Sequence, residues 1–287
     1  MAQLRRLNHD DLEQAVALSR GVGWNQTPAD WARLLTLAPD GVFGALEADR
    51  LVATSSVVAY GDALAWIGMM IVDAEHRGRG LGKRLLDAAL ASPTIAPDAI
   101  VGLDATDMGA PLYRTRGFVD VAPIDRWGGA LRAADAPEDT QVRTVEATDV
   151  AALAAWDVEN TGVERSALVT DLLNTASAEG WLATRDRRIV GYAVVRPGRS
   201  HPHLGPLLAE DDETVDALVA AAAERLARAP VFADVVRSPA REAVFARAGL
   251  RVERRLSRMT LTRRARTRHQ RVLSDAPIWA TAGLEWG

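Results

Sequence analysis

A glycine-rich stretch, Arg77-Gly78-Arg79-Gly80-Leu81-Gly82-Lys83, constrains the fold of this 287-residue chain more than any other part of it. The apolar run from Trp66 to Val72 predicts a strand before it, and the helical spacing of apolar residues from Leu81 onward predicts a helix after it. A glycine turn between a strand and a helix forms an anion site, because the first N–H groups of a helix have no partner within it. Glycines also let the backbone wrap closely around a phosphate. The sequence therefore predicts a phosphate-binding loop, to which three basic side chains add charge.

The common nucleotide loops do not fit this stretch. A triphosphate loop reads G-x-x-x-x-G-K-[ST], but here Arg77 stands at its first position and Arg84 at its last. The dinucleotide fingerprint G-x-G-x-x-G fails at Lys83. The spacing that fits is R-x-x-G-x-G, in which the chain resembles the GNAT superfamily of acyl-CoA N-acyltransferases. That resemblance implies that Arg77–Lys83 hold the pyrophosphate of coenzyme A; the alternative is a solvated basic turn.

A second motif lies downstream, at Ala110-Pro111-Leu112-Tyr113-Arg114-Thr115-Arg116-Gly117-Phe118. It resembles the short GNAT helix that carries a tyrosine and is followed by Gly-Phe at the start of a strand. The interval after the glycine loop leaves room for a helix from Leu81 to about Ala91 and a strand at 99–104. This is the order that the family uses. Tyr113 is otherwise an ordinary helical aromatic.

Composition excludes several other classes of protein. The chain has no cysteine, so disulfides, a catalytic thiol and thiolate metal sites are absent. Its net charge of −4 gives no general attraction to nucleic acid or to an anionic membrane, and no apolar run approaches the length of a membrane span. We expect a cytoplasmic protein without a metal. The GNAT resemblance implies that its partners are acetyl-CoA and a small amine or peptide acceptor, and a homodimer is a possible assembly.

Helix caps and turn residues predict the elements before the loop. A first helix is expected from Asp10 to about Arg20, with Asp10 and Glu13 as a capping-box-like start, and a second one is capped by Thr27. Apolar runs separated by turn residues predict strands at 42–46, 51–59 and 63–72. The segment 135–142 is typical of a linker, which divides the chain into domains at 1–134 and 143–287.

The second half repeats the first. Residues 182–190 resemble the segment that begins at Leu46, Gly205 corresponds to Gly68, and Phe245 corresponds to Tyr113. We therefore expect an α/β (α+β) protein with two tandem GNAT-like domains, each a mixed, mainly antiparallel sheet flanked by helices.

The two copies differ where chemistry would occur. The glycine loop becomes Glu210-Asp211-Asp212-Glu213, whose charge suits a helix start but repels a pyrophosphate. Phe245 has no proton to donate. The chain resembles a subfamily with an active N-terminal GNAT domain and a degenerate C-terminal one, and the closing segment 281–287 is similar to tails of that group. We expect only the first domain to bind acetyl-CoA.

The resemblance also implies the remaining roles. Met70, Ile71 and Val72 would line the pantetheine arm, an N–H near Met70 would stabilise the oxyanion, and Tyr113 would protonate the departing thiolate. Many relatives carry a glutamate on the strand before the loop, but Trp66-Ile67-Gly68-Met69-Met70 has no acid. Asp104 is the predicted base, or else it caps the following turn. Thr106 replaces a frequent asparagine and would contact the cofactor.

Other candidates are less specific. Trp24 lies between the first two helices, where GNAT proteins place substrate contacts, and is either a substrate wall or a packing aromatic. His201 and His203 are predicted to lie on one face of a strand, but without a third ligand we expect no metal. The basic run 263–271 is either a solvated connector, a partner of the acidic loop or a contact for nucleic acid.

Three functions follow from these observations. The first is an acetyl-CoA-dependent N-acetyltransferase acting on a small molecule, an amino acid or a peptide. The second is a non-catalytic acyl-CoA-binding regulatory module. The third is an acetyltransferase for a thiol-cofactor precursor, a substrate class found among tandem relatives.

Overall fold

The computed structural model describes residues 2–132, 140–262 and 277–287. The basic run 263–271 and most of the predicted linker at 135–142 lie outside these residues. The first strand of the second half begins at Gln141, within the last two residues of that predicted linker.

Strands and helices of the first half begin and end close to the predicted positions. They are β1 (Gln3–Arg6), the 3₁₀ turn η1 (His9–Asp11), α1 (Leu12–Gly21), α2 (Pro28–Leu37), β2 (Val42–Glu47), β3 (Arg50–Tyr60), β4 (Leu64–Val72), η2 (Ala74–His76), α3 (Leu81–Leu90), β5 (Ile100–Ala105), α4 (Ala110–Arg114) and β6 (Val119–Ala130). The predicted Thr27 cap is confirmed, because its side chain accepts a hydrogen bond from the N–H of Asp30. The predicted capping box of Asp10 and Glu13 is wrong: η1 precedes α1, so the box forms upstream between Asn8 and Asp11.

The second half repeats this order of elements. They are β7 (Gln141–Thr144), α5 (Val150–Thr161), α6 (Ser166–Asn174), β8 (Glu179–Arg185), β9 (Arg188–Arg196), β10 (His203–Ala209), α7 (Asp212–Leu226), β11 (Pro230–Val236), α8 (Pro239–Arg247), β12 (Arg251–Thr262) and β13 (Ile278–Ala280). Among the described residues, no helix is both long and apolar enough to cross a bilayer.

The described strands form one continuous sheet rather than two separate ones. Its order is β1-β2-β3-β4-β5-β12-β6-β11-β10-β9-β8-β7, with β13 paired to β10. Only β4–β5 and β10–β11 pair in parallel, and the other ladders are antiparallel. This is the predicted α/β architecture with a mainly antiparallel sheet and flanking helices.

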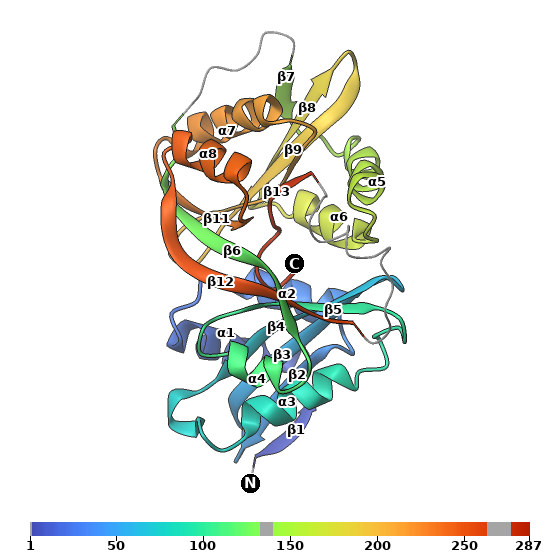
Figure 1. The fold of residues 1–287 in the computed structure, drawn as a ribbon, viewed down its shortest axis with the longest axis vertical. Coiled ribbons are helices and arrows are strands. Elements are labelled where there is room, and N and C mark those ends of the chain that lie inside the picture. The colour runs from blue at the N-terminus through green and yellow to red at the C-terminus, as the bar shows by residue number, and fades with distance from the viewer. Residues whose placement is uncertain (1, 133–139, 263–276) are drawn as a thin grey trace.

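The two halves exchange their last long strands. β12, from the second half, lies between β5 and β6, and β6, from the first half, lies between β12 and β11. Figure 1 shows these two strands running side by side through the middle of the molecule, between the helices of the lower and upper halves. Each half therefore completes the sheet of the other.

Two buried ion pairs fasten the exchanged strands in matching positions. On β5, the two oxygens of Asp104 accept hydrogen bonds of 2.9 Å each from Arg258 on β12. On β11, Asp234 accepts two bonds of 2.8 Å from Arg126 on β6. Neither aspartate side chain has any exposed surface. Removing one partner of such a pair leaves an uncompensated buried charge, at a cost of about 3–5 kcal/mol.

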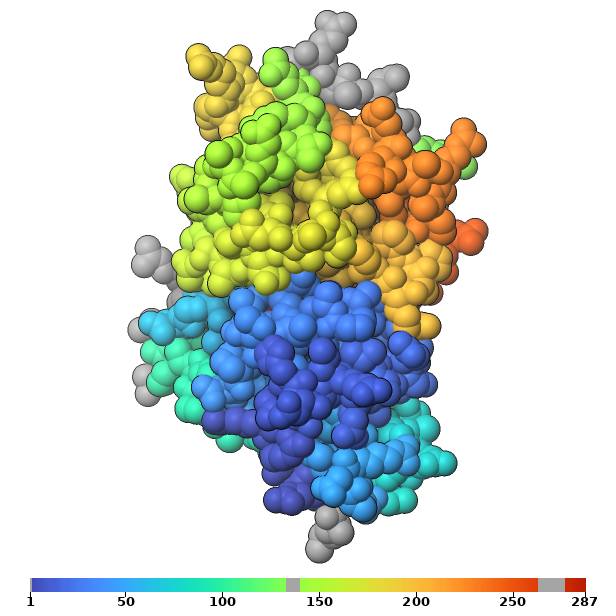
Figure 2. Space-filling model, turned by 180° about the vertical axis from the view of Figure 1, so that it is seen from behind, coloured from blue at the N-terminus to red at the C-terminus, as the bar shows by residue number. Residues whose placement is uncertain are grey.

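Helices cover both faces of the first half's sheet. On one face, Trp31 and Leu34 of α2 pack with Trp66 and Ile71 of β4. On the other face, α3 and α4 pack against the sheet, and Tyr113 is part of that core. Figure 2 shows the α1–α2 region in contact with the second half above it. The first face is thereby enclosed between the two halves.

The segment 281–287 runs from β13 into that enclosed face. The indole N–H of Trp66 donates to the carbonyl oxygen of Leu284 at 2.9 Å, and the hydroxyl of Tyr60 donates to that of Trp286 at 2.8 Å. Trp286 is 1% exposed. A Cβ on Gly68 would lie 2.9 Å from the Cα of Glu285, so only glycine on β4 allows the segment to lie this close.

Candidate active site

The candidate site lies where β4 and β5 separate. The two strands pair only from Leu64 to Trp66 and from Ile100 to Gly102, and both continue beyond the last pair. Past this point β4 contains a bulge, at which Met69 has a φ of +48° and its carbonyl oxygen accepts a hydrogen bond of 2.8 Å from the Thr54 hydroxyl. Bulges redirect backbone groups next to active sites. The candidate site is this divergence of β4 and β5, called the cleft below.

The glycine loop leaves open space in front of α3. Gly78 and Gly80 both have a φ of +75°, a conformation that other residues rarely adopt, and a Cβ on either would meet no atom within 4 Å. Gly82 is closer to its surroundings, since a Cβ there would lie 3.4 Å from Leu112. The first N–H groups of α3, from Leu81 to Lys83, face no partner within their own helix. The loop thus offers the space and the donors that a pyrophosphate needs.

Neighbouring polar groups hold this loop in place. The ring of His76 lies between the carboxylates of Asp73 and Glu47, at 3.3 and 3.1 Å. Arg77 donates through Nε to the carbonyl oxygen of Val72 at 3.2 Å, and Arg79 donates to that of Glu75 at 3.1 Å. Both arginines, like Lys83, are otherwise exposed to solvent.

The predicted pantetheine residues divide between the two faces of β4. Met70 and Val72 are partly exposed and lie on the side of α3. Ile71 is buried on the opposite face, in the core of α1 and α2. Its side chain therefore lies away from the loop, and its backbone is the part that borders the cleft.

Tyr113 and Thr106 lie on the α4 side of the cleft. Tyr113 is 7% exposed and contacts Phe118 edge-on, with ring centroids 6.0 Å apart. Burial raises the pKa of the Tyr113 hydroxyl well above its ordinary value, so it carries its proton at neutral pH. The Thr106 hydroxyl accepts a hydrogen bond of 3.1 Å from the N–H of Gly109, in the turn that leads into α4.

Asp104 lies on β5 two residues beyond the last pair with β4. Burial raises its pKa, and the charge of Arg258 offsets this only in part. Arg258 in turn stacks over the ring of Trp66, 4.6 Å from its centroid. Asp104 is therefore a buried carboxylate with a specific cationic partner, rather than a cap of the following turn.

The corresponding cleft of the second half is filled by the chain itself. β10 and β11 share a single parallel pair, His203 with Phe232. β13 then pairs with β10 at Leu207 and Leu208, and the N–H of Thr281 donates to the carbonyl oxygen of Asp234 on β11 at 2.8 Å. Backbone thus bridges the gap that stays open between β4 and β5.

The loop between α1 and α2 is held by the second half. The Asn25 side chain donates to the carbonyl oxygen of His201 at 2.8 Å and accepts from the N–H of Ser200 at 2.9 Å. Arg199 donates to the carbonyl oxygen of Trp24 at 2.7 Å. Trp24 itself is half-buried and packs against the core of α1 and α2.

The predicted histidine pair is not realised on one strand face. Only His203 belongs to β10, while His201 lies in the preceding loop and stacks on Phe232 with centroids 4.5 Å apart. Proline at 202 separates the loop from the strand start. Across the described ranges, no cluster of three or more metal-ligating side chains is found.

Both halves of the chain match models of a known protein family. A model of the acetyltransferase (GNAT) domain matches residues 38–120, and a second GNAT acetyltransferase model matches residues 153–274. The chain belongs to the GNAT family. The predicted tandem arrangement is confirmed, since each half matches such a domain.

Related proteins include a holothin acyltransferase of Pseudoalteromonas sp. (strain SANK 73390), 28% identical over 69% of this GNAT chain and 66% of the relative. A mycothiol acetyltransferase of Beutenbergia cavernae is 34% identical over 47% of this chain and 52% of the relative. The chain thus spans between about half and two thirds of the length of these relatives.

Two solved structures share the fold of this GNAT chain. A putative acetyltransferase from Pyrococcus horikoshii superposes with a TM-score of 0.80 at 19% identity, covering 100% of this chain and 96% of the other. A tandem GNAT protein from the clavulanic acid pathway gives a TM-score of 0.66 at 15% identity, covering 93% and 100%. At such identities the likeness concerns the fold alone.

Sequence reasoning missed the groups that come from far along the chain. Arg258 reaches Asp104 only because β12 crosses into the first half, and the segment 281–287 reaches β4 by a similar path. No spacing near Asp104 signals a partner 154 residues away. The match between Asp104 and Asp234 appears only in the structure, where each accepts two hydrogen bonds from an arginine of an exchanged strand.

Proposed function

We propose that the first half binds acetyl-CoA and transfers its acetyl group to the amine of a small molecule, an amino acid or a peptide. One observation carries this proposal: β4 and β5 separate beside an open glycine loop, whereas β13 bridges the equivalent gap in the second half. The acidic start of α7 repels phosphate in addition. One cofactor molecule is expected per chain.

The residues around the cleft account for each step of such a transfer. The amine nitrogen bonds to the thioester carbonyl carbon, and an N–H near the bulge at Met69 stabilises the oxygen that becomes negative. The C–S bond then breaks, and Tyr113 donates its proton to the thiolate. Asp104, directly or through water, accepts the proton that the amine loses. Its raised pKa makes it a stronger base than an exposed aspartate.

A thiol-cofactor precursor is the second candidate acceptor. The mycothiol acetyltransferase among the relatives favours it, because that relative shares 34% identity over nearly half of this chain. Both candidates use the same cleft and the same chemistry, and they differ only in the molecule that supplies the amine.

Replacing Gly80 with valine tests the cofactor site. We expect binding of acetyl-CoA to be lost, because a Cβ would strain the φ of +75° and occupy the open space of the loop. Calorimetry on the wild type should give one site per chain. Gly61→Val is a matched control, since Gly61 also has a positive φ, +59°, but lies in the β3–β4 turn. Two equivalent sites, or equal affinity in both variants, would contradict the proposal.

A further inference from the structure

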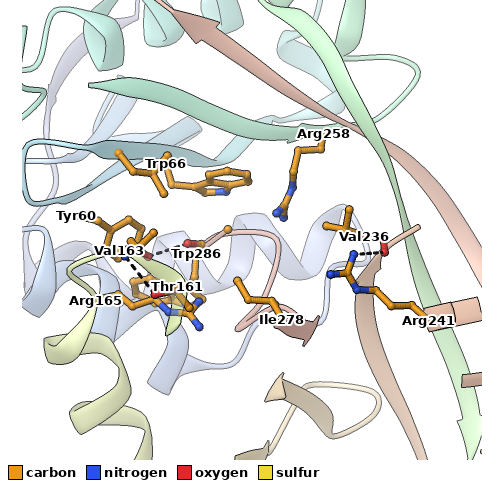
Figure 3. A pocket seen from close by; sticks show the side chains of 12 residues that line it. Tyr60, Trp66, Thr161, Val163, Arg165, Val236, Arg241, Arg258, Ile278 and Trp286 are labelled. Atoms are coloured by element: carbon orange, nitrogen blue, oxygen red, sulfur yellow. Dashed lines mark hydrogen bonds between the residues drawn. The ribbon is translucent and has the colours of Figure 1, made fainter. Parts of the chain in front are cut away.

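Trp66 of β4 lies between the partner of Asp104 and the segment 281–287. Its indole is fully buried and packs against the guanidinium of Arg258, 4.6 Å from the ring centroid. Its N–H donates to the carbonyl oxygen of Leu284 at 2.9 Å. Figure 3 shows Trp66 beside Arg258. One side chain thus contacts both the arginine that holds Asp104 and a residue 218 positions further along the chain.

Two glycines let the indole occupy this position. A Cβ on Gly102 of β5 would lie 2.3 Å from Cζ3 of Trp66, so the ring lies over that strand only because residue 102 has no side chain. A Cβ on Gly287 would lie 2.6 Å from Cδ2 of the same ring. The indole is therefore confined between β5 and the segment 281–287, which leaves it little room to change position.

The position of Arg258 controls the charge environment of Asp104. The Arg258 side chain is 3% exposed and donates two hydrogen bonds of 2.9 Å to the carboxylate. Burial raises the pKa of Asp104, the charge and hydrogen bonds of Arg258 lower it, and the negative charge of Asp234, a smaller effect, raises it. A cation within about 6 Å of an aromatic centroid is attracted to the ring face. The indole of Trp66 thus helps to hold the guanidinium on the carboxylate.

We propose that Trp66 is a positioning residue for acetyl transfer, through which the segment 281–287 holds Arg258 against Asp104. This rests on the acetyltransferase proposed above, with Asp104 as its base. Trp66 acts through the guanidinium rather than on a reactant, because its ring fixes Arg258 and Arg258 fixes the carboxylate. A segment that reaches β4 after the second half thereby contributes to the chemistry of the first.

Trp66→Phe keeps an aromatic ring but removes the N–H that binds Leu284. The pH dependence of kcat is measured with acetyl-CoA and an amine acceptor. We expect its acidic limb to move to higher pH by about half a pH unit or more, because a less firmly held Arg258 lowers the pKa of Asp104 less.

Trp31→Phe is the matched control. The Trp31 indole is as buried as that of Trp66, belongs to the same core and donates a hydrogen bond of 3.1 Å to the Ser19 hydroxyl. This variant should lose a similar amount of stability and leave the acidic limb unchanged. Gly102→Ala keeps the indole but displaces it, so it should shift the limb in the same direction as Trp66→Phe. An unchanged limb in Trp66→Phe and Gly102→Ala, or an equal shift in Trp31→Phe, would overturn the proposal.

Nuclear magnetic resonance tests the same link without turnover. In the wild type, the indole N–H signal of Trp66 should shift with the same midpoint as the carboxyl carbon of Asp104, because Arg258 connects the two groups. In Trp66→Phe, the midpoint of Asp104 should itself move to higher pH. A wild-type Trp66 signal that stays constant while Asp104 titrates would overturn the proposal, whether or not the variants fold. If no amine is acetylated, the proposed function fails, while these titrations still show whether Trp66 holds Arg258 on Asp104.

Discussion

Tyr113 offers the simplest test of the chemistry at the residue scale. The second half places Phe245, fully buried, at the same point of its own fold, so an aromatic ring without a hydroxyl satisfies that helix. Tyr113→Phe should therefore fold normally and bind acetyl-CoA. Turnover should fall by ~10²–10⁴-fold, the range for removing one positioned proton donor. Acyl donors with a more acidic thiol should recover much of the rate. A mutant with near wild-type kcat on its true acceptor would refute the role.

Asp104 has a natural control in the other half. Asp104→Asn and Asp234→Asn each weaken one of the two matching ion pairs with the exchanged strands. If Asp104 is the base, its substitution lowers kcat and weakens the acidic limb of the pH–rate profile, with little change in acetyl-CoA affinity. Asp234→Asn should lose stability without that change in pH profile. Equal kinetic losses in both variants would assign Asp104 to structure alone.

A functional residue could be predicted from the sequence where its role depends on residues close to it along the chain. Gly78 and Gly80 could be chosen because a strand, a turn and a helix follow one another directly. Asp104 could be chosen from its place at the carboxyl end of a predicted strand, but its partner could not. Arg258 lies in a segment rich in arginine, and only the three-dimensional path of β12 distinguishes it from Arg254 or Arg255.

At the scale of elements, the start of α7 provides a pH test. Partial burial raises the pKa of Asp211, but hydrogen bonds from Arg185 and Thr214 outweigh this and lower it to about 2. The folded pKa lies below the ordinary value of 3.8, so the charge of Asp211 stabilises the fold above about pH 4 and this contribution is lost as the pH falls towards 2.

Asp211→Asn keeps a good helix cap but removes the charge. The free energies of unfolding of wild type and variant should therefore differ by a constant amount above about pH 4, and the difference should shrink between about pH 4 and 2. Urea titrations at several pH values measure this. Asp211→Ala, which also removes the cap, should cost a further ~0.5–2 kcal/mol. A difference between wild type and Asp211→Asn that grows in acid would contradict the assignment.

Most element boundaries followed from local signals, and the exceptions have a physical reason. The start of α2 is determined locally by Thr27 and Pro28, and the turn between β3 and β4 is determined locally by Gly61. Both boundaries can therefore be predicted from the sequence. β13 is different, because three residues, Ile278–Ala280, become a strand only by pairing with β10. Nothing in those residues signals that they fill a cleft.

At the scale of the whole molecule, the strand exchange predicts that the halves do not work alone. A fragment of residues 1–134 lacks β12, so β5 has an unpaired edge and Asp104 has no partner. We expect it to aggregate or to be cleaved rapidly by protease. Co-expression with residues 140–287 should give a complex that binds acetyl-CoA, detected by size-exclusion chromatography and calorimetry. A monomeric fragment that binds acetyl-CoA as tightly as the full chain would contradict this.

The tandem architecture was visible in the sequence, but the exchange was not. Gly205 and Phe245 match Gly68 and Tyr113, so the repeat could be read from the chain. β6 and β12 are the equivalent last long strands of the two halves, and local pattern does not determine which half each one completes. The sequence repeat shows which strands are equivalent, but it does not determine whether β6 and β12 pair within their own half or with the other half.

The order in which a ribosome makes this chain gives the exchange a further consequence. β6 emerges long before β11 and β12, which are its neighbours in the finished sheet. During synthesis, both edges of β6 therefore stay unpaired until β11 and β12 have been made. Unpaired strand edges promote association with other chains. The sheet beside the proposed acetyl-CoA cleft is likewise incomplete until β12, which ends at Thr262, has been added. If the proposed function is right, a chain that stops before β12 would be inactive, and acetyl transfer would begin only after β12 has been translated.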